Sequence, residues 1–422
     1  MRPATRVGAL PRAGIGVAML AAAGLLAGCT APQPMPAPTP TATATPIGDG
    51  VLRIGTLFPS TGATAFIGPP QLDAVKVAVA DINAAGGVNG KPVVLLSDDS
   101  GDATTQTAEA SLADLVKKGA DVIIGPSSSV LSQRLLTAAA AAQVALISPA
   151  ATYPQLSSLD AQNVFFRTIP STALQGTALG ALLPSKKQLK VALVASSDPI
   201  GQSIVPTLHD ALAAHGGALV ANIALTASSA PADVIAQLKK AAPDAVVLDT
   251  PDNGAQTKAL ISALAGSGLG GAKLWLTSQN LADYSQALPG GQLTGASGIL
   301  EGADSAAAFQ AKLKAVDPGI GSFQYAPEAY DATILAALAA TLAHDDAGIR
   351  VAAHLRQASV GGIKCTSYAE CLDVLVTEPA IDYDGLSGAV NLDAAGDPTS
   401  GGYGIYTYTA DNKYARSGSV TG

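Results

Sequence analysis

Short apolar runs alternate with longer amphipathic stretches along residues 51 to 276 of this chain. The short runs are rich in Val, Ile and Leu, which is typical of buried strands. In the longer stretches apolar residues recur at helical spacing, as in Leu72, Val75 and Val79, and Gly86-Gly87 ends that helix. We predict strands at 51–57, 93–96, 122–124, 144–147, 191–194, 218–225, 245–248 and 273–276.

This alternation of strand and helix predicts an α/β protein with parallel sheets covered by helices on both faces. The same rhythm restarts after Pro170, so two doubly wound lobes are expected. Open parallel sheets bind their ligands beyond the carboxyl ends of the strands. Two lobes that face each other would therefore place the site in the cleft between them.

The N-terminal residues have the pattern of an export signal. Arginines precede an apolar stretch at 13–27, which ends in Leu26-Ala27-Gly28-Cys29. The stretch is too short for an ordinary membrane span, so we interpret residues 1–28 as a signal peptide. Its last four residues resemble a bacterial lipobox, which implies that Cys29 carries the lipid (palmitate). The alternative is a plain cleaved signal that leaves Cys29 as a free thiol.

Residues 29–49 are almost entirely Pro, Thr and Ala. Such a segment buries little apolar surface and stays extended, which suits a semi-rigid tether. Two or more acyl chains hold a protein firmly to a membrane, whereas one holds it weakly. We therefore expect a protein anchored to the outer face of the cell membrane through lipid on Cys29.

The net charge and the cysteine content reduce the number of possible functions further. Removing three Arg with residues 1–28 takes the formal net charge from −8 to −11, which excludes a basic surface for nucleic acid. Cys365 and Cys371 lie close together and predict a local disulfide in an oxidising compartment. The competing metal site has no nearby His, so we expect no metal. Nothing in the sequence indicates an oligomer, and a monomer is expected.

The motifs of common enzyme classes are missing from the sequence. No G-x-S-x-G elbow and no Walker A sequence occurs. The glycine-rich segment 266–271 follows a predicted helix rather than a strand, which argues against a dinucleotide site. The four histidines have no metal-ligand spacing: His209, His215, His344 and His354. We expect no catalytic residues, no cofactor and no enzyme activity.

Several short motifs, separated along the chain, are shared with a known protein family. They are DINAAGGVNGK at 81–91, IGPSSS at 124–129, ISPAAT at 147–152, FRT at 166–168, YDA at 330–332 and IDYDG at 381–385. In this order they resemble the periplasmic solute-binding proteins of branched-chain amino-acid ABC importers, particularly the lipoprotein versions. The likeness covers the chain from about Val51 onward.

This resemblance implies a type I periplasmic-binding-protein fold, with two lobes that close on a small-molecule ligand about a hinge of three crossovers. Closure would create the surface that an ABC permease and its ATPase recognise. The expected crossovers lie near 168, 298 and 384, which gives lobe I at 50–168 plus 299–384 and lobe II at 169–298 plus 385–422.

The resemblance also implies site residues in the first lobe. Ser127 or Ser128, together with Thr152, matches positions that hold a ligand carboxylate. A helix start in this serine run offers hydroxyls and free N–H groups to an anion. The carbonyl of Ala150, with Ala151 beside it, would accept from an ammonium group. The alternatives are that the serines only cap the helix and that Thr152 bonds its own turn.

In the second lobe the sequence departs from the family pattern. Gln279 stands where the amino-acid binders have an acid, and Ile200 stands where a tyrosine is usual. A neutral amide cannot compensate a desolvated cation, so Asp249 or Asp252 is the candidate for the missing charge. Capping of the next helix is the competing role for either aspartate.

Phe66 is a candidate wall of the pocket, and an ordinary core position is the alternative. The ligand class stays open among amino acids, carboxylates without an amine, amides and urea-like solutes. A ligand-sensing role beside a membrane signalling partner is the alternative to transport.

Overall fold

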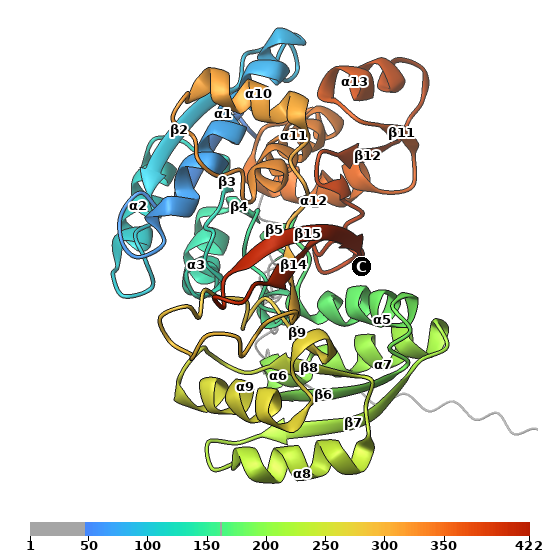
Figure 1. Ribbon diagram of the computed structural model, residues 1–422. Coiled ribbons are helices and arrows are strands. Elements are labelled where there is room, and N and C mark those ends of the chain that lie inside the picture. The colour runs from blue at the N-terminus through green and yellow to red at the C-terminus, as the bar shows by residue number, and fades with distance from the viewer. Residues whose placement is uncertain (1–46, 161–162) are drawn as a thin grey trace, which may run out of the picture. The chain divides into compact units, whose positions relative to one another are not determined.

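The computed structural model describes residues 47–160 and 163–422 as two α/β lobes, each built on its own sheet (Figure 1). The signal peptide, Cys29 and nearly all of the 29–49 tether lie outside the described residues. Lobe I holds a five-stranded sheet and lobe II a seven-stranded sheet, and parallel pairing dominates both. The expected fold class is therefore confirmed.

The lobe I sheet is parallel throughout. In spatial order its strands are β2 (Val94–Asp99), β1 (Arg53–Phe58), β3 (Val122–Ile124), β4 (Ala145–Ser148) and β5 (Phe165–Arg167). Around it lie α1 (Gly68–Ala84), α2 (Thr107–Lys117), α3 (Ser129–Ala142), α4 (Gln155–Leu159), α10 (Ala307–Val316), α11 (Ala326–Ala343), α12 (Gly348–Ser359) and α13 (Tyr368–Thr377).

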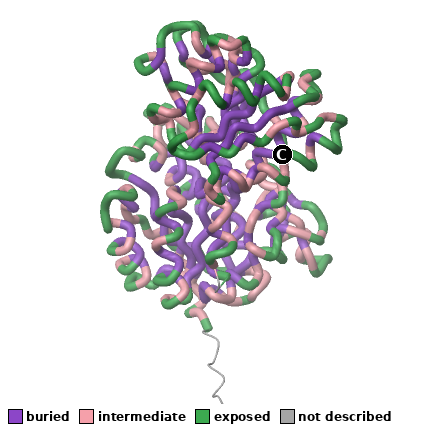
Figure 2. Tube along the Cα trace, turned by 90° about the horizontal axis from the view of Figure 1, so that it is seen from below, coloured by how far each residue is buried: buried purple, intermediate pink, exposed green. Residues whose placement is uncertain are grey.

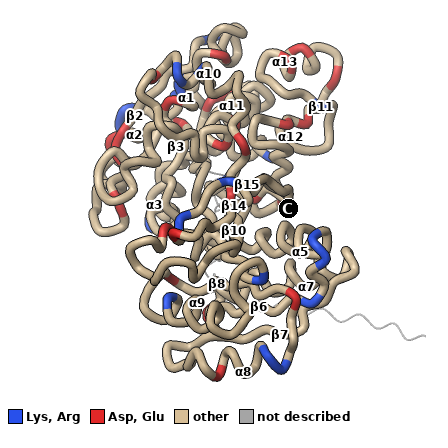
Figure 3. Tube along the Cα trace, viewed as in Figure 1, with Lys and Arg blue, Asp and Glu red and all other residues tan. Residues whose placement is uncertain are grey.

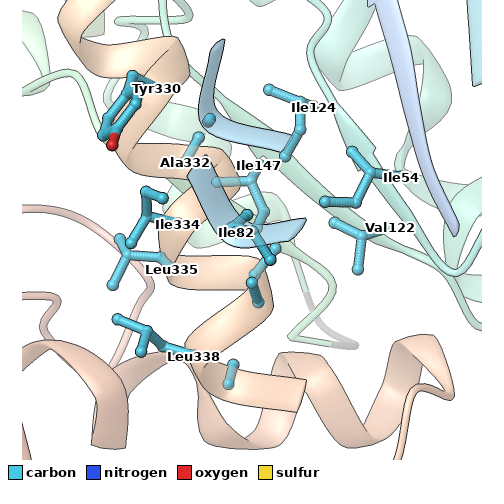
Figure 4. Close-up of a cluster of buried hydrophobic side chains, with 14 of the residues drawn as sticks. Ile54, Ile82, Val122, Ile124, Ile147, Tyr330, Ala332, Ile334, Leu335 and Leu338 are labelled. Carbon is cyan, nitrogen blue, oxygen red and sulfur yellow. The ribbon is translucent and has the colours of Figure 1, made fainter. Parts of the chain in front are cut away.

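Neighbouring residues on the lobe I strands enter different cores, because successive side chains of a strand point to opposite faces. Ile124 packs in the core formed by α1, α10, α11 and α12, whereas Ile123 packs in the core formed by α2 and α3. Figure 4 shows the first of these cores, where Ile54, Val122 and Ile147 of the strands meet Ile334, Leu335 and Leu338 of α11.

The lobe II sheet combines parallel strands with an antiparallel edge. Its order is β15 (Tyr414–Thr421), β14 (Gly402–Tyr408), β10 (Ser297–Glu301), β9 (Leu274–Leu276), β8 (Ala245–Asp249), β6 (Lys190–Ser196) and β7 (Ala218–Leu225). Only β14 and β15 run antiparallel to their neighbours. The helices of this lobe are α5 (Gln175–Ser185), α6 (Pro199–Gln202), α7 (Ile204–Ala214), α8 (Pro231–Ala241) and α9 (Ala255–Ser267).

Helices cover both faces of the lobe II sheet, as the sequence pattern predicts. Val191 and Leu193 of β6 pack with α5 and α7, while Val194 packs with α8 and α9. Figure 2 shows this layering as buried strands inside and exposed outer turns of the helices. The side-by-side placement of α5 and α7 is visible in Figure 1.

A small third sheet extends lobe I. It consists of β11 (Ile363–Cys365), β12 (Ile381–Gly385) and β13 (Gly388–Ala389). The predicted disulfide between Cys365 and Cys371 is present and links β11 to α13. Three single-turn 3-10 segments, η1 (Ala65–Ile67), η2 (Thr172–Leu174) and η3 (Gly271–Lys273), complete the regular structure of the described chain.

The chain passes between the two sheets three times. It leaves β5 at Arg167 and reaches α5 at Gln175, and it leaves β10 at Glu301 to enter α10. The last passage comes later than residue 384, because Val390 and Leu392 still pack in the lobe I core. We therefore propose residues 399–401 as the third crossover and assign 385–398 to lobe I.

The start of α11 contacts the first two crossovers and a lobe I segment that precedes the third. The carbonyl of Glu328 accepts from Thr168 Oγ1 at 2.7 Å, and its Oε1 accepts from the Ala303 amide at 2.6 Å. One turn later Asp331 accepts from the amide of Ser387 at 2.7 Å. A single buried helix of lobe I therefore holds the first two crossovers and the Ser387 segment of its own lobe.

The predicted strands agree closely with the observed ones. Strands at 122–124 and 218–225 coincide with β3 and β7. The first strand begins at Arg53 rather than Val51, and the second extends to Asp99 rather than Leu96. These shifts lie at the ends of the strands, where sequence patterns are least specific.

Within the described residues, no helix combines the length and apolar character needed to cross a membrane. The same part of the chain contains no group of three His, Cys, Asp or Glu side chains suited to a metal ion. Basic and acidic positions are interspersed along the tube in the view of Figure 3.

Candidate functional site

A small pocket lies at the carboxyl ends of β6, β8 and β9, where an open parallel sheet is expected to bind its ligand. Lobe I contributes one side chain to its lining, Tyr153, which follows β4. The lobe II residues of the lining are Ser196, Asp198, Ile200, Gly201, Asp249, Thr250, Pro251 and Gln279.

Asp249 is the buried acid of this pocket. It is the last residue of β8 and only 7% exposed. Burial raises the pKa of its carboxyl to about 6, against a lowering by the Thr277 hydroxyl, which donates to Oδ1 at 2.6 Å. The nearby Asp198 carboxylate raises this pKa further. A cation bound beside Asp249 would therefore stabilise its ionised form.

Asp198 stands at the start of α6 and stays ionised more readily. Burial opposes its ionisation, but hydrogen bonds from Ser196 and from the amides of Gly201 and Ile200 outweigh burial and lower the pKa. Those amides donate to Oδ1 at 3.0 and 2.8 Å. The two aspartates make the lobe II side of the pocket acidic, although Gln279 itself is neutral.

Gln279 lies in this pocket, as its place in the sequence suggests. Its neighbours are held rigidly: Gln175 bonds both Ser278 and the buried Glu301, and the Asn280 side chain bonds the Thr250 backbone. The Gln279 side chain makes no hydrogen bond within the described residues, so both ends of its amide remain available to a ligand.

The lobe I side of the site is the loop that follows β4. The amides of Thr152 and Tyr153 donate to Ser129 Oγ at 2.9 and 3.2 Å, which brings the loop against the start of α3. The Ala151 carbonyl is occupied by Arg167. In the described chain the Ala150 carbonyl and the Thr152 hydroxyl have no hydrogen-bond partner. This loop therefore presents one free acceptor and one free donor.

The serine run before α3 contains two serines with different roles. Ser127 is buried and its hydroxyl donates to Gln71 Oε1 at 2.9 Å. Ser128 is the N-cap residue, and its Oγ accepts from the Leu131 amide at 3.4 Å. A capping hydroxyl keeps its own proton free, so Ser128 can still donate to an anion. The first amides of α3 have no acceptor within the helix, and the Leu131 amide is the one that Ser128 caps.

Of the residues predicted to bind the ligand, Gln279 and Asp249 line this pocket, whereas Ser127, Ser128, Ala150, Ala151, Thr152, Phe66 and Asp252 do not. Phe66 is 68% exposed in η1, and it is not one of the residues around Gln279. Asp252 is exposed, and its Oδ1 accepts from the Gly254 amide at 2.7 Å just before α9. Asp252 therefore does not cap α9, whose N-cap residue is Gly254 without a side-chain cap, and Asp249 rather than Asp252 lines the pocket.

Sequence reasoning missed Tyr153 and Ser196, and it left Asp249 as one of two alternatives. Each is a polar or aromatic residue at or shortly after the carboxyl end of a parallel strand, and that position was the available signal. Asp249 and Asp252 are three residues apart, and only the turn geometry after β8 decides which one faces inward.

The two sides of the site have complementary chemistry. The lobe II lining carries two carboxylates and an amide, while the lobe I loop that contains Tyr153 and the start of α3 beside it carry hydroxyls, helix amides and the Ala150 carbonyl. Donors and a helix N-terminus favour an anionic group, and paired carboxylates favour a cationic one. The arrangement suits a small zwitterion.

Comparison with protein families gives one match over most of the chain. A family model described as Periplasmic binding protein matches residues 51–368. A chemotactic signal transduction system substrate-binding protein, BasB of Halobacterium salinarum, is 26% identical over 364 residues, covering 82% of this chain and 85% of BasB. The Leu/Ile/Val-binding protein BraC3 of Rhizobium johnstonii is 30% identical over 183 residues, covering 43% of this chain and about half (49%) of BraC3.

Solved structures share the fold at low sequence identity. An ABC transporter substrate-binding protein from Desulfitobacterium hafniense, in complex with Leu, is 18% identical with a TM-score of 0.61, covering 87% of this chain and 99% of its own. LivJ from Streptococcus pneumoniae, in complex with isoleucine, is 20% identical with a TM-score of 0.58, covering 88% and 99%.

Proposed function

Because the chain belongs to the periplasmic binding protein family, whose members are extracytoplasmic solute-binding proteins rather than enzymes, we propose that it is the substrate-binding protein of an ABC importer. It captures a small α-amino acid or a related carboxylate or amide in the site between its lobes. Hinge closure then presents the loaded protein to the permease and its ATPase. The protein acts as a monomer.

One observation carries this proposal: buried Asp249 lies in a pocket that also receives Tyr153 from the opposite lobe. A carboxylate this far removed from water is costly unless a cation joins it. A ligand ammonium would supply that cation. Asp249, with Asp198 beside it, thereby replaces the acidic residue that the amino-acid binders have at the position of Gln279.

In this proposal the ligand carboxylate binds at the start of α3. Ser128 and Thr152 have hydroxyl protons that no described residue uses, and the free α3 amides add the positive end of a helix dipole. The Ala150 carbonyl accepts from the ammonium group. Gln279 contacts the bound solute through its free amide, and Ala151 supports the loop through backbone bonds alone.

A thermal-shift screen of the soluble form from Thr30 onward tests the proposal. The panel holds aliphatic amino acids, simple carboxylates, amides and polyamines, each far above its expected Kd. A midpoint shift with amino acids supports the proposed chemistry. Shifts only with carboxylates that lack an amine would contradict the role of Asp249, and no shift with any compound would contradict the function.

We predict that Ser128→Ala and Thr152→Ala each weaken amino-acid binding about tenfold or more, because each removes a hydrogen bond to a charged group. Ser127→Ala is the matched control. It leaves Gln71 Oε1 without its partner and should cost about 1–2 kcal/mol of stability while the affinity stays unchanged. Calorimetric titration measures the affinity and urea unfolding measures the stability. Loss of affinity in Ser127→Ala would mean that the ligand contacts Ser127, contrary to the prediction.

The lipid anchor is part of the proposal and rests on the sequence. We expect Cys29→Ser to abolish palmitate labelling and to move the protein from the membrane fraction to the soluble fraction. The double change Cys365→Ser and Cys371→Ser is the matched control, since it removes two other sulfurs and should leave labelling intact. Labelling that persists in Cys29→Ser would refute the anchor.

A sensing role is the second candidate, and the likeness to BasB, a chemotactic signal transduction system substrate-binding protein, favours it. In that case the closed protein reports its ligand to a membrane receptor. Deleting the gene distinguishes the two roles: uptake of the labelled ligand falls if the protein serves a permease. Intact uptake with loss of movement toward the ligand would establish sensing.

A further inference from the structure

Arg167, at the end of β5, is a fully buried cation that the proposed ligand site does not use directly. All five of its N–H groups have acceptors. Nε and Nη2 donate to the two carboxylate oxygens of Asp397, both at 2.7 Å, and Nη2 also donates to Ser157 Oγ at 2.8 Å. Nη1 donates to the carbonyls of Ala151 and Tyr153 at 3.1 and 3.0 Å.

These bonds join two functionally different segments. The carbonyls of Ala151 and Tyr153 lie on either side of Thr152, in the loop that the proposed function places on the ligand. Asp397 belongs to a turn in which the Asp393 amide donates to the Asp397 carbonyl at 2.8 Å and the Asp397 amide donates to Asp393 Oδ1 at 3.1 Å. The same turn accepts the Arg167 amide through Gly396 at 3.1 Å.

The turn at 393–397 comes just before the third crossover at 399–401. The chain then enters β14, which pairs with β10 in the lobe II sheet. Arg167 therefore connects the ligand loop of lobe I to the segment that leads into lobe II. It does so from β5, whose own end begins the first crossover.

The Arg167–Asp397 ion pair by itself is expected to add little to the stability of the protein. A buried ion pair is often no better than well-packed apolar residues of similar size, because desolvation offsets the attraction. Its particular value is geometric: the planar guanidinium binds a carboxylate on one edge and two carbonyls on another. A lysine has the same charge but lacks the planar set of five N–H donors. It therefore cannot bind the Asp397 carboxylate and the two loop carbonyls at once.

We propose that Arg167 is a positioning residue that fixes the ligand loop, residues 150–153, relative to the crossover turn at 393–397. Movement of the third crossover during closure is thereby transmitted to the loop that contacts the ligand. The inference rests on the proposed function, because it assumes that this loop contacts the bound solute.

The test compares Arg167→Lys with Arg134→Lys in the full chain. Arg134 is a matched control because it also holds a loop of lobe I, through the carbonyls of Ala103 and Thr105, together with Glu109. Hydrogen exchange is measured on peptides that cover 150–158 and 393–398. We expect faster exchange in both peptides for Arg167→Lys and in neither for Arg134→Lys.

Binding of L-leucine by calorimetry is the second readout, at a temperature where every variant is folded. Arg167→Lys should weaken binding on the order of tenfold, whereas Arg134→Lys should leave it unchanged. A lower melting temperature with unchanged affinity and exchange would mean a merely structural role and overturn the proposal. If Arg167→Lys does not fold, Asp397→Asn, which keeps one acceptor, is used instead. We then expect the same faster exchange and weaker binding, but with smaller changes.

The two proposals fail in distinguishable ways. If the wild-type protein binds neither L-leucine nor any other member of the panel, the proposed function fails. The exchange measurements still decide whether Arg167 holds the loop and the turn together. If L-leucine binds and exchange in the two peptides is unaffected by Arg167→Lys, only the role of Arg167 fails.

Discussion

Replacing Asp249 by Asn is expected to weaken binding of an amino-acid ligand roughly thirtyfold or more while making the folded protein more stable at neutral pH. The substitution keeps the shape of the side chain and an oxygen that accepts from Thr277. It removes the charge that would compensate a ligand ammonium. Loss of one partner of a buried charge pair costs about 2–5 kcal/mol of binding free energy, which corresponds to roughly thirtyfold or more in Kd.

The gain in stability follows from the raised pKa of Asp249. Burial, the largest cause, lifts the pKa from 3.8 to about 6, so the folded state binds this proton more tightly than the unfolded state. Stability from this group is therefore full below about pH 4 and is lost as pH rises through about 6. The Asp249→Asn variant would have no such loss, which is up to about 3 kcal/mol at about pH 7.5.

Binding in the wild-type protein should also depend on pH. The ammonium partner requires ionised Asp249, so affinity for L-leucine should fall as pH is lowered through about 6. Calorimetric titration between about pH 5 and 8, with urea unfolding at the same values, measures both effects. Asp252→Asn, on the same loop but exposed, is the control and should change neither. Full binding by Asp249→Asn would exclude this residue as the ammonium partner.

Replacing Asp331 by Ala is expected to destabilise the protein by about 3–5 kcal/mol. The buried carboxylate accepts from the Tyr383 hydroxyl at 2.8 Å, from the Leu386 amide at 2.9 Å, and from the amide and hydroxyl of Ser387 at 2.7 and 2.5 Å. Alanine would leave these donors without partners inside the protein. Burial raises the pKa of Asp331 to about 6, so relief of that cost offsets part of the loss.

Urea unfolding followed by circular dichroism measures the loss of stability in Asp331→Ala. Asp210→Ala is the matched control: its side chain is 82% exposed, and the change should be within about 0.5 kcal/mol. Gly385→Ala should resemble Asp331→Ala, because a Cβ there would lie 2.2 Å from the Asp331 carboxyl group. Wild-type stability in Asp331→Ala would show that the Ser387 segment holds its place without this carboxylate.

Much of the architecture was predictable from local pattern alone. The strands around Val122 and Ala218 were located because apolar runs bounded by glycine and polar residues indicate buried strands irrespective of their partners. The antiparallel hairpin β14–β15 and the late third crossover were not, because the tyrosine-rich 402–421 segment lacks the strand–helix alternation on which the prediction depended.

The candidate site was predictable in part. The loop before Tyr153 was identified from the family motif at 147–152, and Gln279 because it stands where the family has an acid; the structure places Gln279 and Tyr153 in one pocket. Ser127 and Ser128 could not be told apart, because their difference is a contact with Gln71, which is 56 positions away in the chain.

The sequence by itself determined the two-lobed α/β class and the disulfide, and it alone indicates the export signal and the absence of an enzyme's motifs. Each of these follows from periodicity, composition or short-range spacing. Only the tertiary structure decided that Asp249 rather than Asp252 enters the pocket, and that Arg167 reaches Asp397. Those outcomes depend on the direction of a turn after β8 and on burial contacts between residues 230 positions apart, which no local pattern encodes.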